Sequence, residues 1–322
     1  MLAASAQSQS ADDPLSGLVV GDHADPEVPK GWTTVRVRAA ALNHHDVWSL
    51  RGVGLPADRL PMVLGCDAAG VTDDGEEVIV HAVIASPGWT GDETLDPRRS
   101  LLSEVHDGTL AEVVAVPKGN LVLKPEGLSF EHAACLPTAW LTAYRMLFTN
   151  AGVRPGDTVL VQGAAGGVAT AAVQLGSAAG VRMWVTSREA AKGEQAVALG
   201  ADRAFGSGER LPERVDAVLE TVGAATWSHS INSLRPGGTV VISGATSGDN
   251  PDKAELTKVF FKQLRVIGST MGSRTELESL ARFVVTSGIE PVVDSTMPLA
   301  DARDGFARMV EGQVAGKVVF TV

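Results

Sequence analysis

A glycine-rich turn between a buried strand and a helix is the feature that most constrains how this chain can fold. Residues 159–162 are apolar or amide-bearing, and the turn after them contains Gly163, Gly166 and Gly167 before small residues begin at Val168. Glycines let a backbone turn sharply and approach a ligand closely, and the free N–H groups at a helix N-terminus attract anions. The pattern is typical of a strand, turn and helix that bind a dinucleotide pyrophosphate.

The spacing departs from the strict Gly-x-Gly-x-x-Gly fingerprint. Its first position holds Ala164 and its last holds Ala169, while Gly163 stands one place early. The surroundings strengthen the interpretation, because helical patterns such as 168–179 and 189–199 alternate with buried runs. The expected strands are 158–162, 182–186, 203–205, 217–221, 239–243 and 265–269. This alternation predicts an α/β fold with a doubly wound, parallel, six-stranded sheet.

The segments on either side of this series have a different character. Before residue 125, short alternating runs such as 33–39 and 77–83 are separated by turn residues, as in a small, mostly β domain. A helical stretch at 131–150 should break at Pro137. After residue 270 the expected elements are a helix at 275–286, a strand at 289–293, a helix at 299–311 and a strand at 317–322. These two strands do not belong to the six-stranded sheet, so we expect them to return to the first domain. One domain would then comprise residues 1–124 and 272–322, and the other would comprise residues 125–271.

The end of the second expected strand bears on the choice of cofactor. Enzymes that use NAD place Asp or Glu there to bind the ribose 2′-hydroxyl. This chain has Ser187, Arg188 and Lys192 instead, which would bind the 2′-phosphate of NADPH through charge-assisted hydrogen bonds. Glu189 lies one or two places late for the NAD role. The alternative is that Arg188 and Lys192 are simply a solvated helix start.

Several segments together resemble the medium-chain dehydrogenase/reductase superfamily. They are residues 162–169, the turn 155–157, the segment 136–144 and the ending 316–319. Within the superfamily, residues 41–48 and 64–70 resemble the quinone oxidoreductase branch. The resemblance implies a GroES-like, mostly β catalytic domain interrupted by a Rossmann domain. It also implies hydride transfer from a nicotinamide cofactor.

The residues that match the family's zinc ligands are mostly unsuitable for zinc. The three catalytic positions hold Asn43, Cys66 and Thr138, of which only cysteine is a good ligand. The lobe at 85–105, where the family has four cysteines for structural zinc, contains none. The sequence therefore predicts no metal. A different cluster drawn from His44, His45, Asp46 and Asp67 is the alternative, although adjacent histidines seldom point to one place.

The remaining catalytic candidates come from the same matched segments, and each has a structural alternative. Asn43 is expected near the nicotinamide, where its amide could donate to a developing enolate, or else it caps a turn. Asp46 and His45 form a proton relay or fix the loop. Trp48 occupies a position where this branch often has tyrosine, so its side chain can line a pocket but cannot donate a proton. Cys66 is a small buried residue or a reactive thiol.

The resemblance also implies the residues that contact the cofactor. Besides Asn43 and the basic residues above, they are Thr138, Gly163, Ala164, Ala165, Gly166, Gly167, Val168, Ser243, Gly244, Ala245, Phe260, Ser269, Thr270, Met271 and Lys317.

Composition limits the partners and the compartment. The net charge of −11 disfavours nucleic acid and anionic membranes as partners. Residues 1–11 lack the basic start of a signal peptide, and Cys66 and Cys135 are expected to be reduced, so we expect a cytoplasmic protein. The function predicted is NADPH-dependent reduction of a quinone or an α,β-unsaturated carbonyl compound by a homodimer. The alternatives are a low-turnover NADPH-binding protein with a sensing or interaction role, and a residual alcohol dehydrogenase.

Overall fold

The computed structural model describes residues 1–322, which form two compact units. The first comprises residues 1–141 and 271–322, and the second comprises residues 142–270. The second unit begins later than residue 125, where the sequence placed the boundary, because α2 (Phe130–Ala134) packs against strands of the first unit. No helix combines the length and the apolar composition needed to cross a membrane.

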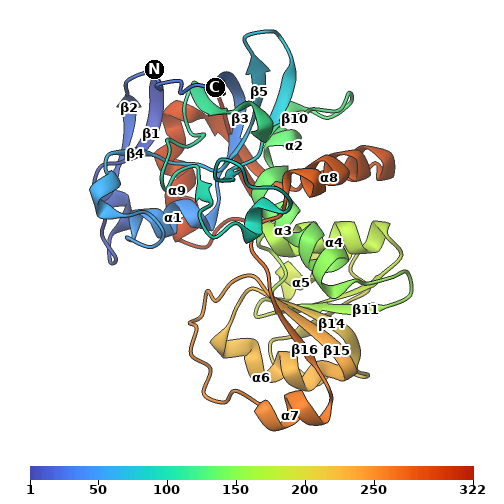
Figure 1. Ribbon diagram of the computed structural model, residues 1–322. Helices are drawn as coiled ribbons and strands as arrows, with labels where there is room; N and C mark the ends of the chain where they lie inside the picture. The colour runs from blue at the N-terminus through green and yellow to red at the C-terminus, as the bar shows by residue number, and fades with distance from the viewer. The chain divides into compact units, whose positions relative to one another are not determined.

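The first unit is built on a seven-stranded sheet with the order β10-β6-β5-β3-β18-β17, in which β9 also pairs with β3. Its strands are β3 (Trp32–Ala41), β5 (Asp67–Thr72), β6 (Glu77–Val80), β9 (Val113–Pro117), β10 (Leu121–Leu123), β17 (Val293–Pro298) and β18 (Lys317–Thr321). The chain's last strand, β18, lies antiparallel to β3, with Val319 opposite Ala41. Segments from both ends of the chain therefore lie side by side in this unit (Figure 1).

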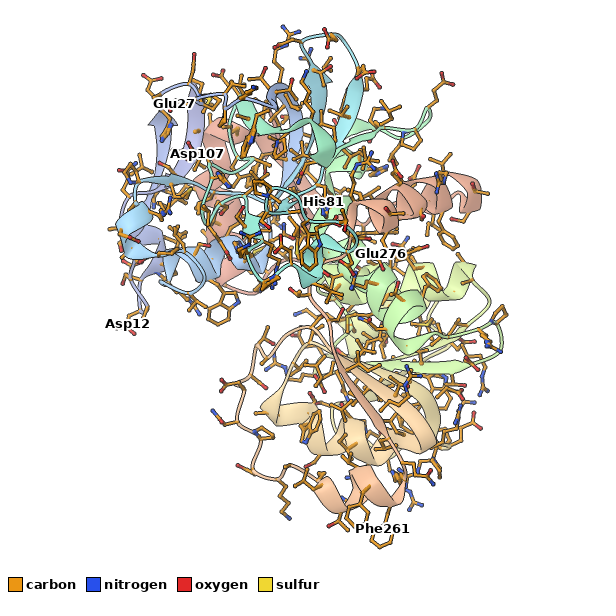
Figure 2. All side chains as sticks on the ribbon, viewed as in Figure 1. Asp12, Glu27, His81, Asp107, Phe261 and Glu276 are labelled. Carbon is orange, nitrogen blue, oxygen red and sulfur yellow. The ribbon has the colours of Figure 1, made fainter.

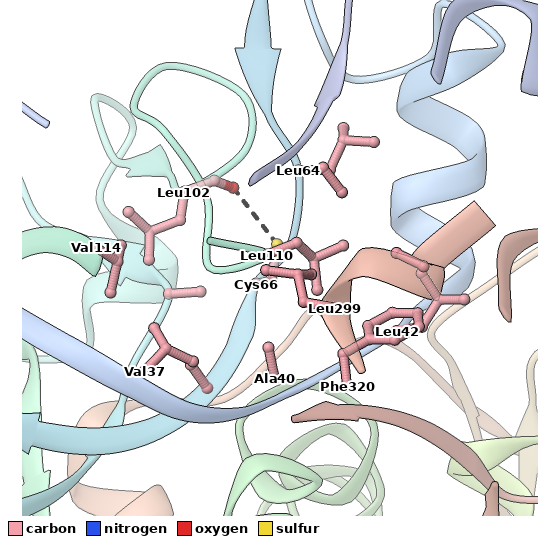
Figure 3. Close-up of a cluster of buried hydrophobic side chains, with 14 of the residues drawn as sticks. Val37, Ala40, Leu42, Leu64, Cys66, Leu102, Leu110, Val114, Leu299 and Phe320 are labelled. Atoms are coloured by element: carbon pink, nitrogen blue, oxygen red, sulfur yellow. Dashed lines mark hydrogen bonds between the residues drawn. The ribbon is translucent and has the colours of Figure 1, made fainter. Parts of the chain in front are cut away.

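Smaller elements complete the first unit. Two short sheets have the orders β2-β1-β4 and β7-β8. Their strands are β1 (Leu2–Ala6), β2 (Leu18–Asp22), β4 (Met62–Val63), β7 (Val83–Ile84) and β8 (Ser100–Leu101), and the unit's further helices are α1 (His44–Leu50), α8 (Arg274–Ser287) and α9 (Ala302–Val310). Strand and loop residues such as Leu42, Leu64, Cys66, Leu110 and Phe320 fill the core (Figure 3).

The second unit contains a parallel sheet with the order β13-β12-β11-β14-β15-β16. Its strands are β11 (Thr158–Val161), β12 (Arg182–Ser187), β13 (Arg203–Gly206), β14 (Val215–Glu220), β15 (Leu234–Ile242) and β16 (Arg265–Gly268), and its helices are α4 (Gly167–Ala178), α5 (Ala190–Ala198), α6 (Ala224–Ser233) and α7 (Leu256–Phe261). The first strand lies in the middle and later strands are added on both sides, with α4 and α6 on opposite faces (Figure 1). The predicted α/β fold is confirmed.

Two expected elements have altered bounds. The helical stretch is interrupted near Pro137, where a π-helical segment (Leu136–Trp140) follows α2 before α3 (Leu141–Tyr144) and a second π-helical segment (Arg145–Ala151). The strand expected at 289–293 begins only at Val293. Pro291 stands just before it and has no N–H for a ladder hydrogen bond.

Candidate functional site

The glycine turn of the second unit has open space above its backbone. Gly163 has a φ of +92°, which favours glycine, and Gly166 has an ordinary φ of −68°. A Cβ on either residue would meet no atom within 4 Å. Because α4 begins at Gly167, its free N–H groups lie at the same turn. This cradle fits a pyrophosphate, and it contains six of the predicted cofactor-binding residues, 163–168.

A network of buried hydrogen bonds supports the turn from below and joins the ends of three strands. Thr186 Oγ1 accepts from Gly163 N at 3.2 Å and donates to Gln162 Oε1 at 2.7 Å. Gln162 Nε2 donates to Ser230 Oγ at 2.9 Å, and Ser230 donates to Glu220 Oε2 at 2.6 Å. The fully buried Glu220 carboxylate also accepts two backbone N–H groups of the turn after β14. This network is not among the features predicted from the sequence, where its only signal is a polar residue at or just beyond the end of each of these buried strands.

The predicted phosphate-binding residues lie together at the end of β12, but they differ in their partners. Lys192 Nζ is 2.8 Å from Glu189 Oε1, so its charge is offset. Ser187 Oγ bonds to the backbone of Glu189. Arg188 is exposed and has no hydrogen-bond or ion-pair partner. A pocket of about 610 Å³ lies here, lined in part by Ser187, Arg188 and Phe205. Arg188 is therefore the residue best placed to bind a phosphate.

The other candidates in this unit separate into two groups. Ser243 lies at the carboxyl end of β15, and Ser269, just after β16, donates its N–H to Ile242 O, so both lie at the edge that also carries the glycine turn. Gly244, Ala245 and Thr270 are their neighbours in the chain. Phe260 instead belongs to α7, and the next turn, at Lys262, bonds to residues at the amino end of β15. The structure therefore does not bring Phe260 together with the other candidates.

In the first unit, Lys317 brings two predicted residues into one buried cluster. Its Nζ donates to Asn43 Oδ1 at 2.6 Å, to Asp67 Oδ2 at 2.9 Å and to a backbone carbonyl at 2.8 Å. Asn43 Nδ2 also donates to Asp67 Oδ2 at 2.9 Å. The side chains of Lys317 and Asp67 are 3% and 0% exposed. The Asn43 amide therefore orients Lys317 and Asp67 in this arrangement, and its donors point into the protein.

A second cluster forms where α1 meets the segment that contains Cys66. Cys66 Sγ donates to Leu102 O at 3.4 Å and lies 3.8 Å from His45 Nδ1 (Figure 3 shows the Leu102 contact). His45 Nε2 is 2.8 Å from Glu104 Oε1. Burial raises the pKa of the Cys66 thiol, which disfavours its thiolate form. Burial alone would lower the pKa of His45, but Cys66, Glu104 and Asp46 outweigh it and hold that pKa well above its usual range.

Asp46 and Trp48 have structural contacts. Asp46 is fully buried, and its two oxygens accept from Asn43 N at 2.8 Å and Gly65 N at 2.9 Å, which ties the start of α1 to the neighbouring loop. Burial raises the pKa of this carboxyl group. The Trp48 ring lies under the guanidinium of Arg51 at 5.3 Å.

Thr138, also predicted for the cofactor, has a buried hydroxyl without a hydrogen-bond partner. Met271 opens the second segment of this unit with a φ of +51°.

The residues at the family's zinc positions do not fit zinc. Asn43 Oδ1 already binds the Lys317 ammonium, and a second cation at Asn43 would be repelled by it. The alternative cluster expected from sequence was drawn from His44, His45, Asp46 and Asp67, whereas the structure brings together His45, Asp46 and Cys66. The ligand atoms of these three residues lie within 4.8 Å of one another, but both Asp46 oxygens already accept from backbone N–H groups. In the 85–105 lobe, Asp96 accepts from Ser86 N and Arg98 N, so a carboxylate holds this loop.

Two family models match separate parts of the chain. The one described as alcohol dehydrogenase GroES-like domain matches residues 29–126, and the one described as zinc-binding dehydrogenase matches residues 167–286. The matched ranges contain the Asn43–Asp67 pair and most of the second unit, respectively.

Individual proteins match along nearly the whole chain. Acryloyl-coenzyme A reductase of Metallosphaera sedula is 31% identical over 326 residues, which cover 95% of this chain and 96% of that protein. A crystal structure of a NAD-dependent alcohol dehydrogenase has a TM-score of 0.92 and 36% identity, with 100% of both chains covered. The structure of crotonyl-CoA carboxylase/reductase AntE in complex with NADP has a TM-score of 0.91 and 25% identity, covering 100% of this chain and 94% of that one.

Proposed function

Because the chain belongs to the medium-chain dehydrogenase/reductase superfamily, we propose that it reduces an activated carbon–carbon double bond or a quinone with NADPH and without a metal. The observation that carries this proposal is the buried Lys317 ammonium on Asn43 and Asp67. A protein cation at a family zinc position leaves no strong Lewis acid to stabilise an alkoxide. The substrate must then spread the charge of an incoming hydride over its own conjugated atoms.

Two comparisons favour an enoyl thioester among such substrates. The relative named acryloyl-coenzyme A reductase and the structural neighbour named crotonyl-CoA carboxylase/reductase both take their names from α,β-unsaturated thioesters. A quinone shares the same electronic requirement and stays in the proposal as a second class.

The cofactor proposed is NADPH, which supplies the hydride when bound. In the second unit the turn at Gly163 and Gly166 would hold its pyrophosphate, and Arg188 would hold its 2′-phosphate. The unpaired state of Arg188 and the pairing of Glu189 with Lys192 support this choice, because the charge of Glu189 is already offset. Glu194, which also lines this pocket, is the carboxylate that would oppose a phosphate. The NADP complex of the neighbour AntE is consistent with it.

The test is NADPH oxidation, followed at 340 nm, with a panel of enoyl thioesters, enals and quinones, in parallel with NADH. We expect turnover with at least one enoyl thioester, a preference for NADPH, and no stoichiometric zinc by elemental analysis. Absence of turnover with the whole panel would refute the proposal, and stoichiometric zinc would refute its metal-free part.

A second candidate is alcohol dehydrogenation with NAD, favoured by the 36% identity to a NAD-dependent alcohol dehydrogenase. It predicts NAD reduction with primary or secondary alcohols and bound zinc. The same elemental analysis and an alcohol panel distinguish the two candidates.

We also propose that two copies pair through the sheet edge formed by β16, which has only β15 as a partner. Val266 on this strand is 45% exposed, and Phe261 and Leu256 on the adjoining α7 are 74% and 70% exposed. Phe261 points outward from the end of α7 (Figure 2). An unpaired strand with apolar neighbours suits a second copy related by a two-fold axis.

A further inference from the structure

The chain leaves the parallel sheet of the second unit at Gly163, and hydrogen bonds fix its backbone up to that residue. Gln162 N donates to Leu219 O at 3.0 Å, which continues the pairing of β11 with β14. Gly163 N instead donates to a side chain of β12, Thr186 Oγ1, at 3.2 Å. A backbone N–H can only donate, so Thr186 Oγ1 is the acceptor wherever its own hydrogen points. The N–H of Gly163 is therefore occupied within the protein and is not free for a ligand.

Buried partners hold the Thr186 hydroxyl in this position. Thr186 is 2% exposed, and its Oγ1 lies 2.7 Å from Oε1 of the fully buried Gln162. The other end of the Gln162 amide lies 2.9 Å from both His229 Nδ1 and Ser230 Oγ. Ser230 in turn lies 2.6 Å from the Glu220 carboxylate, which two backbone N–H groups fix in place. Because the Gln162 amide has partners at both ends, its side chain keeps one orientation and presents Oε1 to Thr186.

The shape of the glycine turn depends on contacts of this kind. Glycine has wide conformational freedom, so its own backbone does not hold Gly163 at a φ of +92°. Valine has nearly the shape of threonine, but its methyl group cannot accept a hydrogen bond from Gly163 N. Without that acceptor the turn can relax into other shapes. A ligand that needs the original shape then binds more weakly, in proportion to the fraction of molecules that still have it.

We propose that Thr186 is a positioning residue for the cofactor, whose hydroxyl holds the glycine turn in its binding shape before the dinucleotide arrives. This rests on the proposed function, because it takes the turn as the pyrophosphate site. NADPH and NADH both carry the pyrophosphate, whereas only NADPH carries the 2′-phosphate assigned to Arg188. Loss of the Thr186 hydroxyl should therefore weaken the binding of both cofactors by the same factor, in contrast to a change at Arg188.

The experiment compares Thr186→Val with Thr186→Ser, which keeps the hydroxyl, and with Thr158→Val as a matched control. Thr158 is 1% exposed at the opposite, amino end of β11, where its hydroxyl accepts from Arg182 Nη2. In fluorescence titrations, Thr186→Val should raise the Kd of both NADPH and NADH about fivefold or more, as expected for loss of one hydrogen bond. Thr186→Ser and Thr158→Val should keep both Kd values within about twofold of wild type.

A second readout needs no ligand. Hydrogen exchange in the cofactor-free protein should show a protected Gly163 amide in the wild type, in Thr186→Ser and in Thr158→Val, and a fast-exchanging one in Thr186→Val. A Gly163 amide that exchanges fast in the wild type would overturn the proposal. An equal loss of cofactor binding in Thr158→Val and Thr186→Val would also overturn it, because the effect would then be one of general stability.

The two cofactors separate the remaining outcomes. Unchanged Kd values in Thr186→Val, or a loss of NADPH binding alone, would contradict a role at the pyrophosphate turn. If the expected binding changes are found but the wild type reduces no substrate, the role of Thr186 is supported and the proposed reduction is refuted. If the wild type binds neither cofactor, both proposals are refuted.

Discussion

At the scale of single residues, Lys317 and Asp67 form the most buried ion pair of the first unit. Both charges are buried, and Asn43 completes the hydrogen bonding between them. Removing one partner leaves the other charge uncompensated, which costs about 3–5 kcal/mol. We expect Lys317→Met to lower the free energy of unfolding by about this amount in urea titrations. The double variant Lys317→Met, Asp67→Asn should recover a large part of the loss, and additive losses would contradict the direct pairing.

The His45–Glu104 contact predicts a pH dependence of stability. The folded-state pKa of His45 is raised above its ordinary value of 6.5, so the contact stabilises the fold fully below that pH. The stabilisation is lost as pH rises through the folded-state pKa. We expect the difference in urea midpoint between wild type and Glu104→Gln to be larger at pH 6 than at pH 10. A difference that grew with pH would contradict a raised pKa.

Arg188 and Lys192 differ in what they can offer a phosphate, because only Lys192 is already paired. A hydrogen bond to a charged group contributes about 1.5–3 kcal/mol, and about 1.4 kcal/mol is a tenfold change in affinity. We therefore expect Arg188→Ala to weaken NADPH binding by about tenfold or more and to leave NADH binding unchanged, as measured by fluorescence titration. Lys192→Ala should have a smaller effect, and equal effects of the two variants would contradict this assignment.

At the scale of elements, the glycine turn after β11 contains one glycine that the fold requires, Gly163, and one that only a bound ligand would require, Gly166. Gly166 has an ordinary φ and open space at its Cβ, so alanine fits the folded chain. The same methyl group would occupy the space above the turn. We expect Gly166→Ala to lower the melting temperature by no more than about 4 °C, since Gly166 is the N-cap of α4 and alanine at an N-cap costs about 1 kcal/mol. Cofactor binding should fall by at least tenfold.

Gly163→Ala is the control for this prediction. Its φ of +92° is strained for any residue with a Cβ, so this variant should lose both stability and cofactor binding. If Gly166→Ala bound the cofactor as tightly as wild type, the pyrophosphate would not approach the turn there.

The elements of the second unit could be predicted from sequence because they are local patterns. Strand-like runs, glycine turns and helix starts recur in order, and the central strands β11, β12 and β14 are mostly buried, while the edge strands β13 and β16 are mostly exposed. The Gln162–Thr186–Ser230–Glu220 network could not be predicted, since it joins the ends of three strands whose neighbours are decided by sheet order. The same holds in the first unit, where Asn43 and Lys317 lie in distant segments of the sequence and meet only because β18 pairs with β3. The boundary near 125 shifted because burial of α2 is a tertiary effect.

At the scale of the whole molecule, the exposed edge of β16 predicts the oligomeric state. Val266→Asp would introduce one carboxylate from each copy into the interface if two copies pair along this short strand, and like charges close together across paired strands are destabilising. Val197 on α5 is also 45% exposed in the same unit and provides a matched control. We expect wild type and Val197→Asp to sediment at twice the chain mass of 33.4 kDa, and Val266→Asp at the chain mass. A wild-type monomer, or a Val266→Asp dimer, would contradict the proposed interface.

The position of Lys317 in the last strand has a consequence for synthesis on the ribosome. Residues 142–270 contain every strand of the second unit, so that unit can fold while the chain is still growing. Asn43 and Asp67 are made much earlier than Lys317, and their charge partner arrives only with β18. Until then, the growing chain carries an unpaired Asp67 carboxylate, and a premature stop before residue 317 would release a protein with a complete second unit and without the buried Asn43–Asp67–Lys317 cluster.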